Sequence, residues 1–431
     1  MAKAGSKRRY DAMRTRTIIL LVVIVLAILS AGCTDAAKRE DKVSGTLKVA
    51  FFDQAAFMRL YGERIQRHYP DLKLETVAVP LDKIDDPAAY SKFLRENGID
   101  IAAMHDYGMF QSTMQRGELA DLRPLAKEDG FDLDVIPPSL LALWSEPAAG
   151  TVHAIAPSFS ILGLFVNNEA FTRYGAQPPG GSPAWGDVFA AAALLKDAED
   201  VEPLEWQGMD KPLDWMLAVA AVEQLRLVDR DGKHVLLGTP AWQKVFQSVV
   251  KGHELGVLSL DGSREAVIPD PSQQPVRAML VDSTGNISNR RGSDTNWQPL
   301  PLPGIEAGGK RTPVLFPALF AIPASSVQPE LAWKLLAYVG SEEWNRVTAG
   351  ASTDFPIRAD MMPDNKVYDV AGALNGEMSA WTMEKLPRGA REALQPIVSQ
   401  TVRDVLEGKL SADEAIRRMT EESDAALRAL R

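Results

Sequence analysis

Residues 47–52 read LKVAFF, residues 72–77 read LKLETV and residues 99–103 read IDIAA, and these three short apolar runs decide the fold. Each has the length and composition of a buried β-strand. A helix is expected between the second and third runs, from Tyr90 to Asn97, with Gly98 as its cap. Another is expected between the first two, where apolar residues recur at helical spacing: Phe57, Leu60, Tyr61, Ile65 and Tyr69. Strand, helix, strand, helix, strand predicts a parallel α/β sheet.

The rest of the chain continues this mixture of helix and strand patterns. A C-terminal helix is expected to begin at the capping box of residues 411–414, SADE. The apolar run 314–322 is too long, and too interrupted by proline, for one simple strand. Other helices are predicted at residues 185–195, 212–228, 240–255 and 330–339, and other strands at 153–157, 162–166, 276–281 and 297–302.

The only cysteine, Cys33, follows a basic start, an apolar run from Ile18 to Leu29 and three small residues. This order resembles a bacterial lipoprotein signal, so we expect residues 1–32 to be cleaved and Cys33 to carry lipid. The apolar run is shorter than the roughly 20 residues that a transmembrane helix needs. An ordinary cleaved signal with an incidental cysteine and an uncleaved anchor are the alternatives. Residues 33–45 are polar and charged, which predicts a flexible tether.

Charge and length limit the class of protein. Of 47 Lys and Arg and 57 Asp and Glu, residues 1–32 hold six basic and one acidic residue, so the remainder has a formal charge of −15. Such an acidic chain is not expected to bind nucleic acid or anionic lipid. One cysteine allows no intramolecular disulfide. A chain of 431 residues exceeds what one hydrophobic core usually serves, so two lobes are expected.

Short motifs in fixed order resemble the family 1 extracellular solute-binding proteins, the maltose-binding-like receptors of ABC importers. Each motif is weak alone, and their order over nearly the whole chain after the signal carries the resemblance. The motifs are YPDLKLE at 69–75, IDI at 99–101, GELADL at 117–122, HAIAP at 153–157, FVNNEAF at 165–171, PAWGDV at 183–188, AM at 278–279, PELAW at 329–333 and FPIR at 355–358.

The resemblance implies an α/β, two-lobe periplasmic-binding-protein-like fold of type II, with helices flanking each sheet and a multi-strand hinge. Lobe 1 would take residues 46–153 plus 320–346, and lobe 2 residues 154–319 plus 347–431. The ligand would lie between the lobes. This agrees with a general rule, because ligands of open α/β sheets bind beyond the carboxyl ends of the strands.

Polar and aromatic residues after the strands are the candidate ligand contacts, because carboxylates and amides bind sugar hydroxyls and aromatic rings stack on sugar rings. Asp53 can equally be a helix N-cap, which is also the alternative for Asp106. The candidates are Asp53, Gln54, His105, Asp106, Tyr107, Ser158, Ser160, Trp206, Trp215, Asp282, Asn286 and Asp354.

The tryptophans divide into two groups. Trp185 and Trp333 match helix-packing positions of the family, so we expect them and Trp344 to be in the core. Trp206 and Trp215 lie where the second lobe presents an aromatic residue to the cleft, and core or cleft is equally open for them. Where many relatives have a stacking tryptophan after the AM motif, residues 282–286 read DSTGN, with no aromatic.

Enzyme motifs are lacking in this sequence. GIEAGGK at 304–310 nearly spells a phosphate-binding P-loop, but Arg311 replaces the required Ser or Thr and no helix follows. The chain has no GxSxG or HExxH motif, and its five histidines are too scattered for metal ligation. We therefore expect no catalysis, no cofactor and no metal.

The sequence predicts a monomeric receptor, anchored by lipid on the extracytoplasmic face of the cell membrane, that captures a small polar solute. The resemblance implies a carbohydrate as ligand and the membrane permease of an ABC importer as partner. A lipoprotein that uses the same fold to sense a ligand, or to bind a partner, for a membrane kinase is the alternative.

Overall fold

The computed structural model describes residues 43–84, 86–146, 148–198, 200–229, 231–261, 275–289, 297–309, 311–351, 354–362 and 377–430. The predicted signal peptide of residues 1–32, the predicted lipidation site Cys33 and the tether up to residue 42 lie outside these ranges. No helix within the described ranges is long and apolar enough to cross a membrane.

The first sheet confirms the strand pattern that opens the chain. β1 (Gly45–Phe51) pairs in parallel with β2 (Leu72–Ala78) on one side and β3 (Ile101–Met104) on the other. β13 (Leu319–Ala321) adds an antiparallel edge beside β3, which gives the order β13-β3-β1-β2. Since β1 is central, the carboxyl ends of β1 and β3 lie side by side, and the residues that follow them meet.

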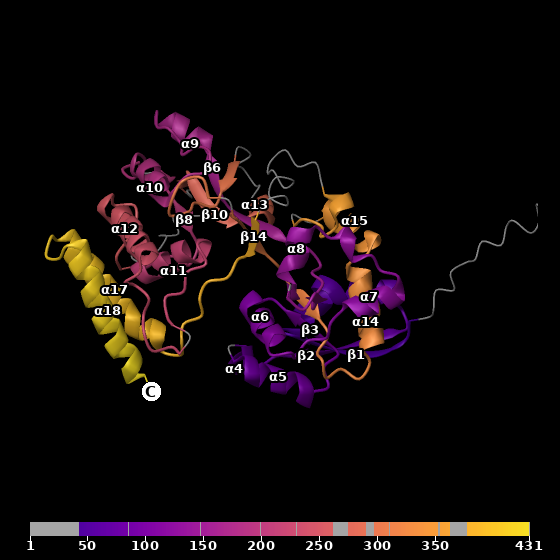
Figure 1. The fold of residues 1–431 in the computed structure, drawn as a ribbon. Helices are drawn as coiled ribbons and strands as arrows, with labels where there is room; N and C mark the ends of the chain where they lie inside the picture. The colour runs from indigo at the N-terminus through magenta and orange to yellow at the C-terminus, as the bar shows by residue number, and fades with distance from the viewer. Residues whose placement is uncertain are drawn as a thin grey trace, which may run out of the picture.

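Helices surround this sheet (Figure 1). The predicted helix after β1 is split by a π-helical turn, Met58–Gly62. The α-helices of this half are α2 (Gln54–Phe57), α3 (Glu63–His68), α4 (Leu81–Ile84), α5 (Pro87–Glu96), α6 (Tyr107–Gln115), α7 (Arg123–Asp129), α8 (Pro138–Leu143), α14 (Pro329–Val339) and α15 (Glu342–Ala351). Short 3-10 turns at Leu133–Val135 and Ala359–Met361 and the hairpin of β4 (Ser145–Glu146) and β5 (Thr151–Val152) complete it.

The second sheet is built around β6 (Ser160–Asn167), which is buried along its whole length. β10 (Met279–Ser283) pairs antiparallel with one side of β6 and in parallel with β8 (Glu205–Trp206). On its other side, β6 pairs with β11 (Trp297–Pro301) and β12 (Arg311–Leu315), and β14 (Glu377–Ala380) extends the sheet beyond β12. β7 (Val201–Glu202) and β9 (Val276–Arg277) form a separate pair.

The helices around the second sheet are α9 (Asn168–Arg173), α10 (Trp185–Ala193), α11 (Pro212–Val222), α12 (Pro240–Glu254), α13 (Thr284–Asn289), α17 (Ala390–Leu406) and α18 (Ala412–Ala429). α18 begins at the predicted capping box, where Ser411 and Glu414 each bond the other's backbone N–H. α11 ends at Val222, six residues before the predicted end at 228.

Two predictions about strands differ in outcome. The apolar run 314–322 is indeed not one strand, because Phe316–Ala318 separate β12 from β13. The predicted strand at 153–157 is wrong in extent, since among these residues only Ile155 forms a bridge, with Phe320. A single bridge forms there because the chain is leaving the first sheet for the second.

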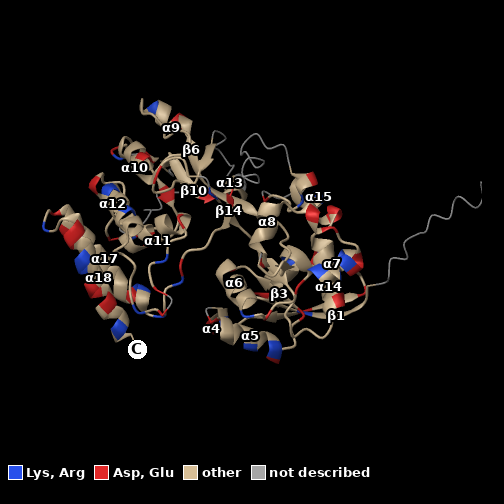
Figure 2. Cartoon of the chain, viewed as in Figure 1, with Lys and Arg blue, Asp and Glu red and all other residues tan. Residues whose placement is uncertain are grey.

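Two large hydrophobic cores lie on the two sheets, and Figure 1 shows the corresponding two bodies. The chain leaves the first core between Ile161 and Leu162, and Phe355 and Ile357 also belong to the first core. Phe159 and Phe355 exchange backbone hydrogen bonds of 3.0 and 2.7 Å where the bodies join. Charged residues are frequent on the outer helices (Figure 2), whereas the sheets are largely uncharged. The exact lobe limits remain a prediction.

Candidate functional site

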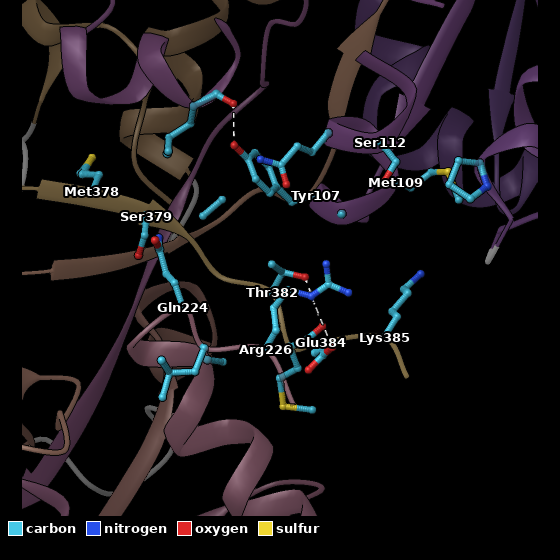
Figure 3. A pocket seen from close by; sticks show the side chains of 18 residues that line it. Tyr107, Met109, Ser112, Gln224, Arg226, Met378, Ser379, Thr382, Glu384 and Lys385 are labelled. Carbon is cyan, nitrogen blue, oxygen red and sulfur yellow. Dashed lines mark hydrogen bonds and ion pairs between the residues drawn. The ribbon is translucent and has the colours of Figure 1, made fainter. Parts of the chain in front are cut away.

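A cavity of about 640 Å³ opens between elements of the two cores. One wall comes from α6 and α8 of the first core, and the other from the end of α11 and the residues after it, while residues 378–385 run along the cavity (Figure 3). Its lining is Pro87, Tyr107, Gly108, Met109, Gln111, Ser112, Leu143, Ala221, Gln224, Leu225, Arg226, Met378, Ser379, Ala380, Thr382, Met383, Glu384 and Lys385. The lining combines apolar and neutral polar groups with three charged residues, Arg226, Glu384 and Lys385, and sites for small organic ligands likewise combine apolar groups with a few polar ones.

The first wall is fixed by Asp106, which follows β3 directly. Its Oδ1 accepts a hydrogen bond of 2.6 Å from the N–H of Met109, which caps α6. Its Oδ2 lies 3.3 Å from Nζ of Lys385, on the far side of the cavity rim. The hydroxyl of Tyr107 donates to the carbonyl of Leu143 at 2.8 Å and so fixes its ring against α8. Asp106 is therefore the N-cap of α6, which was the alternative to a ligand contact, and it also forms an ion pair with Lys385.

His105 lies beside this wall and between two smaller cavities of about 20 and 60 Å³. Its ring packs edge-on against Phe52, with centroids 5.0 Å apart. Burial lowers the pKa of His105 below 6.5, against the opposing effect of Asp106. The imidazole is therefore neutral at pH 7 and offers one donor and one acceptor.

The second wall begins where α11 ends, at Gln224. Its φ of 55° makes it the only non-glycine residue with positive φ in the described part of the chain. The N–H groups of Gln224 and Leu225 bond the carbonyls of Ala221 and Ala220, at 3.1 and 3.0 Å. A left-handed residue therefore closes the helix, and for a side chain other than glycine this costs about 1 kcal/mol. This reversal explains why the helix stops before the predicted end.

Glu384 ties the loop after α11 to the segment that follows β14. Its carboxylate accepts from the N–H of Leu227 and, at 3.2 Å, from that of Val228. Nε of Arg226 lies 3.6 Å from the same carboxylate. Both carboxylates beside the cavity, Asp106 and Glu384, are thus already bonded by the protein.

Four tryptophans pack together beside the 60 Å³ cavity. Trp381 is partly exposed and lines the 60 Å³ cavity. Its ring lies 5.8 Å from that of Trp206, which in turn stacks on Trp185 at 5.3 Å with an interplanar angle of 10°. Trp215 is only 4% exposed and packs edge-on against this stack from within the core. The predictions for Trp185, Trp333 and Trp344 as core residues are confirmed, at 0, 2 and 3% exposure.

Three predicted site residues meet at the junction of the bodies instead. Ser158 donates a hydrogen bond of 3.2 Å to Oδ2 of Asp354, and Ser160, two residues further on, begins β6. Gly285, the first-turn glycine of α13, lies against Oδ1 of Asp354. Burial raises the pKa of Asp354, and the bond from Ser158 opposes this. None of these residues lines the 640 Å³ cavity.

The remaining predicted residues make local contacts. Asp53 accepts from the N–H of Ala56 at 2.6 Å and caps α2, as its alternative reading held. The amide of Gln54 donates to the carbonyl of Thr76 at 2.5 Å. Asn286 donates to Asp282 at 2.9 Å, on the surface. Their part in ligand binding stays a prediction.

Sequence reasoning missed most of the second wall. No local pattern singled out these residues, because some follow the end of α11 and the others lie in or directly after β14, a strand that the sequence did not predict. The missed residues are Gln224, Arg226, Ser379, Trp381, Thr382 and Lys385. Among the described residues, no group of three His, Cys, Asp or Glu side chains is placed to hold a metal ion.

The chain matches one family model. The family model described as bacterial extracellular solute-binding protein matches residues 53–346, more than half of the chain. A search of the curated proteins gives no match.

Solved structures share the fold. The GacH receptor of Streptomyces glaucescens, solved unliganded and with acarbose, is 19% identical over 89% of this chain and 99% of that chain, with a TM-score of 0.59. The sugar-binding protein MalE of Xanthomonas citri is 14% identical over 90% and 98%, with a TM-score of 0.63. An ABC transporter solute-binding protein of Agrobacterium vitis with bound D-mannitol is 16% identical over 89% and 98%, with a TM-score of 0.58. The predicted two-lobe, periplasmic-binding-protein-like fold is confirmed.

Proposed function

The chain belongs to the bacterial extracellular solute-binding protein family, and we propose that it is a lipid-anchored receptor that captures a sugar or oligosaccharide for an ABC importer. The observation that carries this proposal is the 640 Å³ cavity between the two cores. This volume lies within the range of small-molecule sites, roughly 300–1,000 Å³.

The chemistry of the cavity supports a polyhydroxylated ligand. Hydroxyls of Ser112, Ser379 and Thr382 and the amides of Gln111 and Gln224 supply neutral donors and acceptors. Trp381, which lines the neighbouring 60 Å³ cavity, offers an aromatic face. It lies elsewhere in the chain than residues 282–286, where many relatives have a stacking tryptophan and this chain has none. The structural neighbours whose names include acarbose, D-mannitol or sugar binding agree with this ligand class.

Closure of the two bodies over the ligand gives the mechanism. A ligand that contacts both walls binds the closed arrangement more tightly than the open one. The difference between its two binding free energies is the amount by which it stabilises the closed arrangement. The three chain crossings near Phe159, Phe316 and Phe355 would act as the hinge.

Binding is tested with the full-length protein purified in detergent. Thermal unfolding is followed with maltose, maltotriose, D-mannitol, glycine and spermidine. A ligand present at 100 times its Kd stabilises the folded state by about 2.7 kcal/mol. A saturable rise in Tm with a carbohydrate alone supports the proposal, whereas a rise only with glycine or spermidine contradicts the carbohydrate ligand.

Anchoring is tested by the substitution Cys33→Ser. We expect the wild-type protein to incorporate labelled palmitate and to sediment with membranes, and the variant to do neither. Lipid incorporation in the variant, or unlabelled wild-type protein, would contradict the lipoprotein assignment. Deletion of the gene should abolish uptake of the sugar that raises the Tm. Unchanged uptake would favour the sensor function.

A further inference from the structure

The backbone at Gln224 is unusual for its residue type. Every other described residue with positive φ is a glycine, and glycine is the residue that closes a helix in this conformation without steric cost. A glutamine in the left-handed region is strained, because its Cβ approaches its own carbonyl oxygen. Strain that is retained at one residue points to a function for its side chain.

The side chain of Gln224 makes no hydrogen bond with any other described residue, so no described contact of this side chain accounts for the strained backbone. It is exposed, lines the 640 Å³ cavity, and in Figure 3 lies beside Ser379. The hydroxyl of Ser379 likewise has no hydrogen bond among the described side chains, although the residue is only 7% exposed. Two neutral polar groups are therefore directed at the same part of the cavity without a hydrogen-bond partner among the described residues.

We propose that Gln224 is a specificity-determining residue whose amide binds adjacent hydroxyl groups of a neutral polyhydroxylated ligand. A primary amide donates through its nitrogen and accepts through its oxygen, so it can pair with two neighbouring hydroxyls at once. This inference rests on the proposed function, and it names Gln224 as the residue through which the second wall binds the ligand.

The charges around Gln224 favour a neutral ligand. Glu384 is bonded by two backbone N–H groups and lies beside Arg226, and Lys385 pairs with Asp106. A charged ligand would have to compete with these contacts, whereas a hydroxylated one needs only the amide of Gln224 and the hydroxyl of Ser379.

The position of Gln224 also allows it to contribute to closure of the two bodies. It stands at the end of α11, on the second core, while Tyr107 and Ser112 stand on α6, on the first. A ligand held by Gln224 and by α6 bridges the two bodies. The Gln224 contact therefore contributes to closure as well as to selectivity.

The test uses the full-length protein in detergent and the substitutions Gln224→Gly and Gln224→Asn. Calorimetric titration with maltose, maltotriose and D-mannitol gives Kd, and thermal unfolding without sugar gives Tm. We expect Gln224→Gly to have a Tm at least as high as the wild type and to bind the recognised sugar at least tenfold more weakly. Gln224→Asn keeps a shorter amide in a residue that tolerates this backbone, so its affinity should fall between the two.

The outcomes separate the two proposals. Sugar binding by the wild type with an unchanged Kd in Gln224→Gly would overturn the role of Gln224 and leave the proposed function intact. A marked fall in the Tm of Gln224→Gly would also overturn it, because the glutamine would then be structural. No binding of any of the three sugars by the wild type would overturn the proposed function and this inference together.

Discussion

Nζ of Lys385 lies 3.3 Å from Oδ2 of Asp106, and this ion pair joins the start of α6 on the first core to the segment that leads into the second core. Asp106 also caps α6 through its other oxygen, so one carboxylate has a local and a long-range role. The two roles can be separated by substitution.

Substitution of Asp106 and Lys385 should show that the cap matters more to stability than the ion pair. Lys385→Met removes the pair and leaves the cap, and because the lysine side chain is 45% exposed we expect a loss of at most about 1 kcal/mol. Asp106→Ala loses the cap as well and should cost about 1 kcal/mol more than Asp106→Asn, since asparagine also caps helices. Urea unfolding measures each loss.

Lys92→Met is the control for that series, because Lys92 forms a surface pair with Glu96 at 3.6 Å. It should change stability by no more than Lys385→Met does. If Lys385→Met destabilises as much as Asp106→Ala, the ion pair and not the cap is the dominant contact.

Trp381 and Trp215 should respond in opposite ways to substitution by alanine. Trp381 is partly exposed at a cavity, so Trp381→Ala should weaken binding of maltotriose about tenfold, equivalent to roughly 1.4 kcal/mol, with a small change in stability. Trp215 is 4% exposed, so Trp215→Ala should destabilise by about 3–5 kcal/mol. Calorimetric titration and urea unfolding provide the two readouts. Equal affinity of Trp381→Ala and wild type for maltotriose would remove Trp381 from the site.

Asp354 should make stability depend on pH. Burial raises the pKa of Asp354 above its ordinary 3.8. A carboxyl group with a raised folded-state pKa stabilises the fold fully below that ordinary value, and this contribution is lost as the pH rises through the raised pKa. Asp354→Asn stays neutral and keeps an oxygen that accepts from Ser158, so its urea midpoint should exceed that of the wild type at about pH 7 and match it near about pH 3.5.

The matched variant for this pH series is Ser158→Ala. It removes the hydrogen bond that favours the charged carboxylate, so the pKa of Asp354 should rise further. A difference between Asp354→Asn and wild type that stays constant over the pH range would show that Asp354 does not titrate as its burial implies.

Gly285 should not tolerate alanine, although it lies in a helix. Alanine normally favours a helix over glycine by about 1 kcal/mol. Here the added Cβ would press on Oδ1 of Asp354, so Gly285→Ala should destabilise by about 1–3 kcal/mol in urea unfolding. Gly186→Ala, in α10, meets no atom within 4 Å and should be neutral or stabilising.

A double-mutant cycle completes that test. In an Asp354→Ala background the obstacle is gone, so Gly285→Ala should lose most of its cost. An unchanged cost in that background would mean that Asp354 is not the group that excludes a side chain.

Local pattern predicted the first sheet and the main helices well. β1, β2 and β3 were each expected within three residues of their limits, because their apolar runs are short and bounded by polar residues. The predicted strand at 153–157 failed, since an apolar run says that a segment is buried and not which backbone it pairs with. The core tryptophans were assigned correctly from the family motifs around them.

The candidate site was predicted only in part. Asp106 and Tyr107 were found because they follow β3, whereas Gln224 lay inside what was expected to be a longer helix. Nothing near Trp381 or Lys385 in the sequence indicates that they approach β3. Their positions depend on how residues 381–389 run along the cavity from β14 to α17.

The sequence by itself determined that the first strands form a parallel sheet, where the main helices lie and which family motifs occur, because each strand, helix and motif is a run of neighbouring residues. Only the tertiary structure decided that the end of α11, the segment after β14 and the start of α6 surround one cavity. The reason is physical: those segments are brought together by the burial of two separate cores, and the hydrogen bonds of Asp106 and Glu384 form only after that packing.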